Sequence, residues 1–363
     1  MTNDAQPAPG AGSAFKPVRP NATGPVSLSS GWSLARFARR SEAGALVGTV
    51  GMFIFFAIFG GKDFLAVGGV ASWLNVASEL GIIALPVGLL MIAGELDLSV
   101  GSVLAGSSVT CAIVSGYYNA PPFIGVLAGL ALGALTGFIN GLIVSRTRVA
   151  SFVVTLATNF GLIGLTLGLS RAITGSTSVA IQPDTADKDI FGYLIGGKFE
   201  IAVVWWVVIA LVVAWLLQES KYGNWIFAIG GDLESARTTG IPVAKVKISL
   251  FVASGLGAAL VGVIQTMLYN GAQVTSGQSF VFNSIIAVVV GGVLLTGGYG
   301  SPFGIMLGTL TFAIVSQGIY YTSWNSDWSS LILGLLLLAA VLMNNTFRKM
   351  ALADRRRTRA GKG

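Results

Sequence analysis

Glu95 and Asp97 are two carboxylates placed where carboxylates are rare. They lie in segment 94–102, GELDLSVGS, which interrupts a long apolar stretch. A charged side chain at membrane depth costs about 2.5–3.5 kcal/mol on insertion scales, so each of them needs a structural or functional reason. Two interpretations are open. Asp97 and Ser99 cap the helix that follows a short turn, or the segment is a break between two half-helices whose polar groups line or gate a path.

Segment 218–245 is the second polar region. Asp232 is placed to cap a short helix that Gly240 would end and that Pro242 would stop. A short polar helix on the membrane surface is a suitable docking site for a partner protein. A plain connecting loop is the alternative interpretation.

Amides and glycines inside the apolar stretches form a third set. Asn140, Asn159 and Asn283 are candidates for lining a path, although intramembrane amides more often hydrogen-bond between helices. Glycines that recur every four residues indicate closely packed helices, because small residues let two backbones approach. The glycines in such patterns are Gly129, Gly133, Gly137, Gly141, Gly304 and Gly308.

Several kinds of chemistry are excluded by the residues that are missing. The chain has no His and one cysteine, Cys111, so it has no histidine acid–base chemistry, no His/Cys zinc site and no internal disulfide. The phosphate-binding pattern G-x-x-x-x-G-K-[ST] is absent. We therefore expect no catalytic residues and no metal or cofactor bound by this chain.

The composition shows which elements must position these residues. Of the 363 residues, 53% are hydrophobic and 10% are charged, whereas soluble domains carry about 25% charged residues. Apolar runs near the length of about 20 residues that crosses a bilayer predict an all-α polytopic membrane protein of about ten helices. The predicted spans are 43–60, 76–94, 100–117, 123–144, 151–170, 200–217, 246–269, 281–296, 303–321 and 329–346.

The charge distribution predicts the orientation in the membrane. The net charge of +7 is concentrated in a disordered tail, 1–42, and a basic tail, 347–363, so it indicates membrane edges and no nucleic-acid binding. With both tails in the cytoplasm, the basic residues on the outer side are only Lys62, Arg171, Lys188 and Lys198. The positive-inside rule favours this orientation, in which segment 218–245 is cytoplasmic.

A faint internal repeat divides the membrane domain, 43–346. Val87-Gly88 recurs as Val261-Gly262 with an offset of 174, and Gly129-x-x-x-Gly133 recurs as Gly304-x-x-x-Gly308 with an offset of 175. Five spans separate the copies. Since five is odd, the two halves would be inverted relative to each other, which is typical of transporters.

The motifs resemble those of a known family. GELDLSVGS, GFINGLIV at 137–144, FVVTLAT at 152–158, the loop 228–242 and LTGGYG at 295–300 resemble the permeases of bacterial ribose-type ABC importers. The resemblance covers roughly residues 45–346. Ser151, where a proline is expected, and Glu95, where Gly or Ile is commoner, depart from the family pattern and leave the substrate subgroup open.

The resemblance implies a membrane-spanning subunit of an ATP-driven importer in the bacterial inner membrane. The fold would be like that of the vitamin B12 permeases, and two permease chains would form the path. ATP and Mg would bind to a separate cytoplasmic ATPase, and a periplasmic binding protein would deliver a monosaccharide or polyol of the ribose, xylose, arabinose, galactose, fructose or inositol type. The contacts with the ATPase would come from Asp232, Glu234, Arg237, Thr239 and Gly240.

Two alternatives stay open at this point. One is a related ABC permease for branched-chain amino acids or nucleosides. The other is an ion-coupled secondary transporter, which needs buried carboxylates, and for which Glu95 and Asp97 are the only serious candidates in the sequence.

Overall fold

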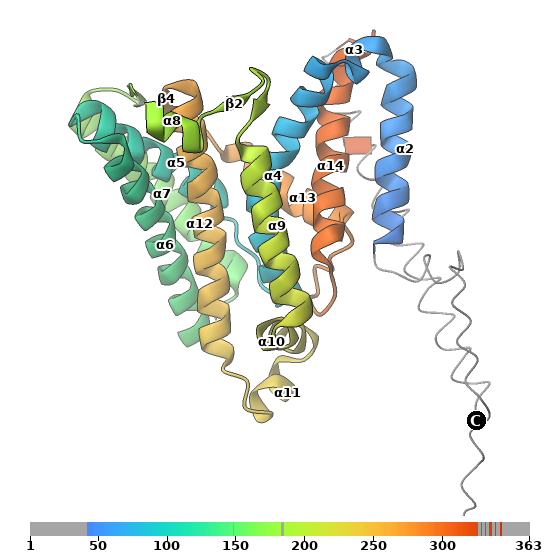
Figure 1. The fold of residues 1–363 in the computed structure, drawn as a ribbon. Coiled ribbons are helices and arrows are strands. Elements are labelled where there is room, and N and C mark those ends of the chain that lie inside the picture. Colours follow the sequence, from blue (N-terminus) through green and yellow to red (C-terminus); the bar gives the residue numbers. More distant parts are fainter. Residues whose placement is uncertain are drawn as a thin grey trace, which may run out of the picture.

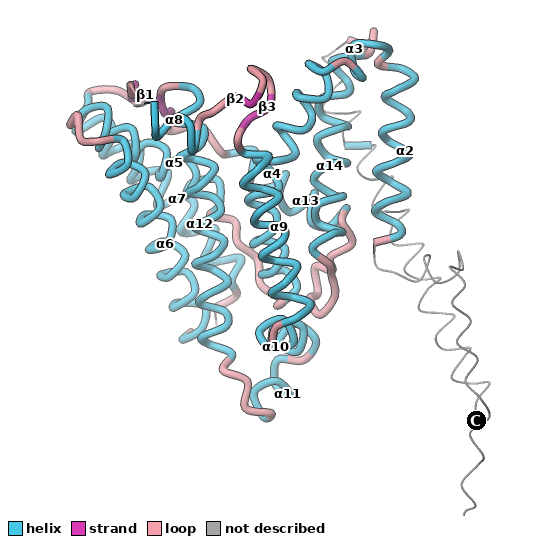
Figure 2. Tube along the Cα trace, viewed as in Figure 1, coloured by secondary structure: helices cyan, strands magenta, loops and turns pink. Residues whose placement is uncertain are grey.

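A computed structural model describes residues 42–147, 149–182 and 185–325, together with 328, 331, 334, 335, 338 and 342. In this part of the chain, the secondary structure is almost entirely helical, and the long helices run side by side (Figures 1 and 2). The predicted tail 1–42, apart from Glu42, and the predicted tail 347–363 lie outside the described residues.

Within the described ranges, seven helices are long and apolar enough to cross a membrane. They are α4 (Val67–Ile92), α5 (Val100–Ala112) with its π-helical continuation η1 (Ile113–Tyr117), α6 (Pro122–Arg146), α7 (Ser151–Thr174), α9 (Ala202–Glu219), α12 (Val243–Tyr269), and α14 (Pro302–Gly318) with the 3-10 turn η2 (Ile319–Tyr321). Two shorter apolar helices, α2 (Ala43–Phe59) and α13 (Gln278–Val290), lie beside them. The chain is a polytopic all-α membrane protein.

The remaining elements lie at the two ends of this helical layer. Helices α10 (Lys221–Gly231) and α11 (Leu233–Thr238) are at one end, and α3 (Gly61–Leu65), α8 (Thr185–Phe191) and the strands are at the other (Figure 1). Strand β1 (Ser178–Ala180) pairs antiparallel with β4 (Gly271–Gln273), and β2 (Leu194–Ile195) pairs with β3 (Phe199–Glu200). The β1–β4 pair joins the chain after α7 to the chain after α12.

The predicted spans from 43–60 to 303–321 coincide with helices, with two corrections. Helix α4 begins at Val67, before the predicted start of span 76–94, since Trp73 and Asn75 lower the local hydropathy without breaking the helix. Helix α13 ends at Val290, inside the predicted span 281–296, because the next two residues are glycines and Gly292 has a φ of +91°. Span 329–346 lies largely outside the described residues.

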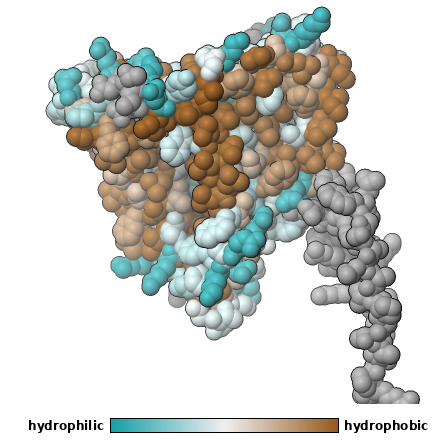
Figure 3. Space-filling view, in the orientation of Figure 1, coloured by the Kyte–Doolittle hydropathy of each residue, from teal (hydrophilic) through white to brown (hydrophobic). Residues whose placement is uncertain are grey.

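The burial pattern separates central helices from lipid-facing ones. The most apolar window of α4 is 89% buried and that of α12 is 67% buried, whereas those of α7 and α9 are 28% buried. Large apolar side chains such as Phe160 and Leu211 therefore face outward. Hydrophobic residues cover the middle of the face in Figure 3, and hydrophilic residues gather at its two ends. An exposed apolar belt of this kind is what a lipid environment requires.

The glycine pattern brings α6 close to α12. A Cβ on Gly133 would lie 2.5 Å from the carbonyl oxygen of Gly255, and a Cβ on Gly137 would overlap the backbone of Phe251. Gly304 and Gly308 lie in the same way against the end of α13. These helices approach at distances that only small residues permit.

Candidate functional site

The chain between α4 and α5 is an irregular segment, 93–99, held inside the protein. Its second residue, Gly94, follows the C-cap Ala93 of α4 and has a φ of +82°. The backbone N–H groups of Leu96 and Leu98 donate to the hydroxyl oxygens of Ser151 and Thr155 at 3.1 and 3.0 Å. Two hydroxyl side chains of α7 thus satisfy backbone groups that have no helical partner. Backbone N–H groups inside an apolar membrane protein need such partners.

Asp97 is the centre of this segment. One of its carboxylate oxygens, Oδ1, accepts from the backbone N–H of Ser99 at 2.9 Å and from its hydroxyl at 2.6 Å, and Oδ2 accepts from the hydroxyl of Ser254 at 2.7 Å. The residue is 1% exposed. Ser99 occupies the N-cap position of α5 but makes no side-chain capping bond, so the carboxylate stabilises the turn before the helix and Ser99 does not cap it.

The polar cluster continues into α6 and α7. The amide nitrogen of Asn140 donates to the hydroxyl of Ser99 at 3.0 Å, and the hydroxyl of Thr158 donates to the amide oxygen of Asn140 at 2.6 Å. Together with Ser254 of α12, this chain of hydrogen bonds connects the break with three helices. We call Asp97, Ser99, Asn140, Thr158 and Ser254 the Asp97 cluster.

Glu95 forms a buried ion pair with Lys247. The two residues are 9% and 8% exposed. Lys247 lies in the second turn of α12, which begins at Val243, shortly after α11 ends. The ion pair therefore joins the break to α12, the helix that begins at the end of the polar segment 218–245. Lys247 was not among the predicted site residues.

A second break, 291–301, lies against the first. It separates α13 from α14 and contains Gly297 and Gly298, with φ values of +80° and +73°. The N–H of Gly298 donates to the carbonyl oxygen of Ile92, the last residue of α4, at 2.8 Å. Gly230 of α10 packs between them, because a Cβ there would overlap Ile92 and lie 2.6 Å from the nitrogen of Gly298. Three motifs far apart in the sequence meet here.

Helix α11 is present as the sequence predicted, and Asp232 caps it. Its Oδ1 accepts from the N–H groups of Glu234 and Ser235 at 3.0 and 3.1 Å. The hydrogen bonds from the N–H and the hydroxyl of Ser235, together with that from the N–H of Glu234, lower the pKa of Asp232 below its usual value. Gly240 follows with a φ of +83°. Arg237 lies 3.6 Å from Glu234, and both side chains are exposed.

The other candidates lie elsewhere. The hydroxyl of Thr239 donates back to the carbonyl of Ser235 at 3.0 Å. Asn159 is buried on α7, and its Oδ1 has no hydrogen-bond partner among the described residues. Asn283 is half-buried on α13. Neither asparagine belongs to the Asp97 cluster.

Glu79 is a third buried carboxylate, so the expectation that Glu95 and Asp97 were the only serious candidates is wrong. It lies on α4, is 8% exposed and accepts a hydrogen bond from the amide nitrogen of Gln265 at 2.9 Å. Its other oxygen has no partner in the described part of the chain. Glu79 carries a signal in the sequence, because it also interrupts an apolar run.

Within the described residues, no three Asp, Glu or Cys side chains gather closely enough to hold a metal ion. The breaks, the Asp97 cluster and the buried ion pair are fixed polar structures inside an apolar helical layer. This combination is typical of membrane transport proteins, in which irregular backbone at depth lines or controls a path.

The chain belongs to the permease family described as "Branched-chain amino acid transport system / permease component", which matches residues 69–341. Since the described part of the chain has seven helices that are long and apolar enough to cross a membrane, it is a multi-pass protein of the bacterial inner membrane.

Curated relatives cover most of the chain. The fructose import permease FrcC of Rhizobium meliloti is 32% identical over 88% of this chain and 89% of its own length. The ribose import permease RbsC of Bacillus subtilis is 33% identical over 81% of this chain and 91% of its own length. The xylose transport permease XylH of Haemophilus influenzae is 26% identical over 81% of this chain and 93% of its own length.

Proposed function

We propose that this chain is the membrane-spanning subunit of an ATP-driven importer for a monosaccharide or related polyol. The observation that carries the substrate class is its similarity, over nearly their full length, to relatives that import ribose and fructose. This similarity favours a sugar over a branched-chain amino acid or a nucleoside.

The geometry of the α10–α11 region supports coupling to a separate ATPase. Helix α11 projects from one end of the helical layer, capped by Asp232 and carrying exposed Glu234 and Arg237 (Figure 1). The backbone behind it leads directly into α12 and Lys247, which pairs with Glu95 in the break. A push on α11 by a bound ATPase would thus be transmitted to the break between α4 and α5. The partner, and not this chain, binds ATP and Mg.

The proposal includes a ten-helix fold with two inverted halves and both tails in the cytoplasm. In its support, α4, α5 and α6 follow one another as α12, α13 and α14 do, near the offset of the sequence repeat. Gly101 of α5 and Gly277 before α13 also contact each other reciprocally, each within 2.5 Å of the other's carbonyl oxygen if given a Cβ. In this orientation α11 lies in the cytoplasm and the β1–β4 pair faces the periplasm.

Two further partners complete the transporter. A second permease chain, in a homodimer, would enclose the path with this one, and a periplasmic binding protein would deliver the substrate to the end that carries the β1–β4 pair. The apolar outer faces of α6 and α7 are available for the lipid bilayer and for the second chain.

Purification from native membranes tests this function. A tagged chain is extracted in mild detergent, and its partners are identified by mass spectrometry and assayed for ATPase activity. We expect an ABC ATPase and a periplasmic binding protein to copurify, and the reconstituted complex to import a sugar only with ATP. Copurification of neither partner, under conditions that preserve a known ABC importer, would contradict the proposal.

A further inference from the structure

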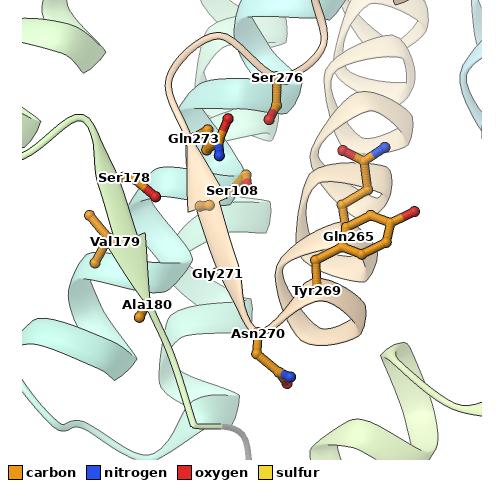
Figure 4. A pocket seen from close by; sticks show the side chains of 11 residues that line it. Ser108, Ser178, Val179, Ala180, Gln265, Tyr269, Asn270, Gly271, Gln273 and Ser276 are labelled. Atoms are coloured by element: carbon orange, nitrogen blue, oxygen red, sulfur yellow. The ribbon is translucent and has the colours of Figure 1, made fainter.

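A polar cavity of about 390 Å³ lies at the end of the molecule opposite α11. Its walls are the β1–β4 pair, α5 at Ser108 and the last two turns of α12 at Gln265 and Tyr269. Figure 4 shows the side chains of Ser178 and Ser276 on either side of Gln273. Side chains from four separate segments thus present polar groups to one space.

The chemistry of the lining selects a class of ligand. Among the described residues, those that line the cavity include no Asp, Glu, Lys or Arg. A zwitterionic amino acid would bring two charges into a space whose described lining residues carry none, which is unfavourable. Amide and hydroxyl groups both donate and accept hydrogen bonds, and so do the hydroxyl groups of a sugar. The volume lies within the range of about 300–1,000 Å³ that is usual for small-molecule sites.

One of these side chains is held in a defined orientation. The amide nitrogen of Gln265 donates to the buried carboxylate of Glu79. The amide oxygen of Gln265 is consequently turned to the other side, toward Gln273 and Ser276 (Figure 4). Glu79 therefore acts as a positioning residue that presents an acceptor to the cavity, where the hydroxyl of a ligand can donate to it.

We propose that this cavity is a subsite for a neutral polyhydroxylated molecule, in which Gln265, Gln273, Ser178 and Ser276 hydrogen-bond the ligand and the ring of Tyr269 contacts its apolar face. The proposal rests on the proposed function and adds a place for the sugar on this chain. In the proposed orientation, the subsite is on the periplasmic side, where the substrate arrives.

Protection of an introduced cysteine tests the subsite. Ser276→Cys is made in the complete transporter, assembled with its ATPase and binding protein in proteoliposomes, and its modification by a membrane-impermeant thiol reagent is timed. The buried native Cys111 serves as an unreactive background. A sugar at ten times its dissociation constant for this cavity should slow the modification about tenfold, since the fraction of unliganded cavities falls by about that factor. Ribose, xylose, fructose and leucine are the probes.

Lys198→Cys is the matched control. It is exposed at the same end of the molecule and does not line the cavity, so its modification rate should not depend on sugar. Gln273→Ala, which removes one of the groups that hydrogen-bond the ligand, should raise KM for the sugar.

The outcomes separate the two proposals. If a sugar is imported but does not protect Ser276→Cys, the subsite is wrong and the proposed function stands. If leucine alone is imported, the proposed function fails and the subsite fails with it.

Discussion

At the scale of single residues, the loss of one partner of the buried ion pair should lower the free energy of unfolding more than most other single substitutions. Glu95 and Lys247 are both almost completely removed from solvent. Removing one partner of such a pair leaves an uncompensated buried charge and typically costs about 3–5 kcal/mol. Lys247→Met should therefore destabilise the protein strongly, whereas Lys245→Met, at an exposed position on the same helix, should not.

Thermal unfolding of the purified transporter in detergent measures this difference. The double variant Glu95→Leu/Lys247→Met removes both charges, so it should recover much of the stability that the single variant loses. If Lys247→Met is as stable as Lys245→Met, the ion pair does not stabilise the break.

The site could be predicted from the sequence only in part. Glu95, Asp97 and Ser99 stood out because charged and polar residues are costly in an apolar stretch. Lys247 did not, since it lies near the start of a span, where a lysine suits the membrane surface. Its partner is 152 positions away, and a single sequence carries no signal that pairs two such distant residues.

At the scale of elements, the contact of α10 with the two breaks depends on one glycine. A Cβ on Gly230 would overlap the carbonyl oxygen of Ile92, whereas a Cβ on the adjacent Gly231 would meet nothing within 4 Å. Gly230→Ala should destabilise the transporter by at least the ~1–3 kcal/mol of an overpacked core. Gly231→Ala should be close to neutral.

The comparison of these neighbouring substitutions needs only unfolding curves and the amount of protein in the membrane. Both variants lose the same backbone freedom in the unfolded chain, so the difference between them reports the packing alone. Equal stability of the two variants would mean that α10 does not pack against the breaks as described.

Helix α11 carries a second prediction at this scale. Gly240 has a φ of +83°, which proline cannot adopt, so Gly240→Pro should displace the helix. Arg237→Glu should reverse an exposed charge without touching the Asp232 cap. If α11 docks the ATPase, both variants should insert normally but should lose ATP-dependent transport.

Transport in proteoliposomes and copurification of the ATPase measure this effect. Lys62→Glu is the control, because it reverses an exposed charge at the opposite end of the molecule. Undiminished transport by Arg237→Glu and Gly240→Pro would remove the coupling role from α11.

The elements were easier to predict than their ends. Hydropathy located the helices because each needs about 20 apolar residues. It placed the start of α4 too late, because Trp73 and Asn75 lower the local hydropathy. In the structure both side chains have partners: Trp73 stacks on the ring of Phe64, and the amide of Asn75 donates to the carbonyl of Lys198. Such tertiary contacts are not visible in a local window.

At the scale of the whole molecule, the stability should depend on pH through Glu200. Burial raises the pKa of this carboxyl, outside the membrane-spanning helices, from 4.5 to about 7. Because the folded state holds the proton more tightly than the unfolded chain, its contribution is fully present below pH 4.5 and is lost as the pH rises through about 7. The protein should become less stable across this interval.

Glu200→Gln, which cannot ionise, should flatten that slope. The measurement is the unfolding midpoint as a function of pH for both proteins, with Glu219→Gln, a carboxyl at the opposite end, as the control. A slope that is unchanged in Glu200→Gln would mean that this carboxyl is ionised in the folded state like any exposed one.

At the scale of the whole molecule, Glu79 and Asp97 bear on whether transport is driven by a proton gradient or by ATP. A carrier driven by a proton gradient needs a carboxyl that binds and releases a proton during transport. Asp97 and Glu79 are both buried deeply enough to do so. In an importer driven by a separate ATPase, the same carboxylates only accept hydrogen bonds from Ser99, Ser254 and Gln265.

Asp97→Asn and Glu79→Gln retain an acceptor but cannot ionise. We therefore expect both variants, in proteoliposomes with the ATPase and the binding protein, to keep transport that requires ATP, at an altered rate. The purified chain alone should accumulate no sugar when a proton gradient is imposed. Accumulation by the chain alone, abolished by either substitution, would establish an ion-coupled carrier and would overturn the ATP-driven importer.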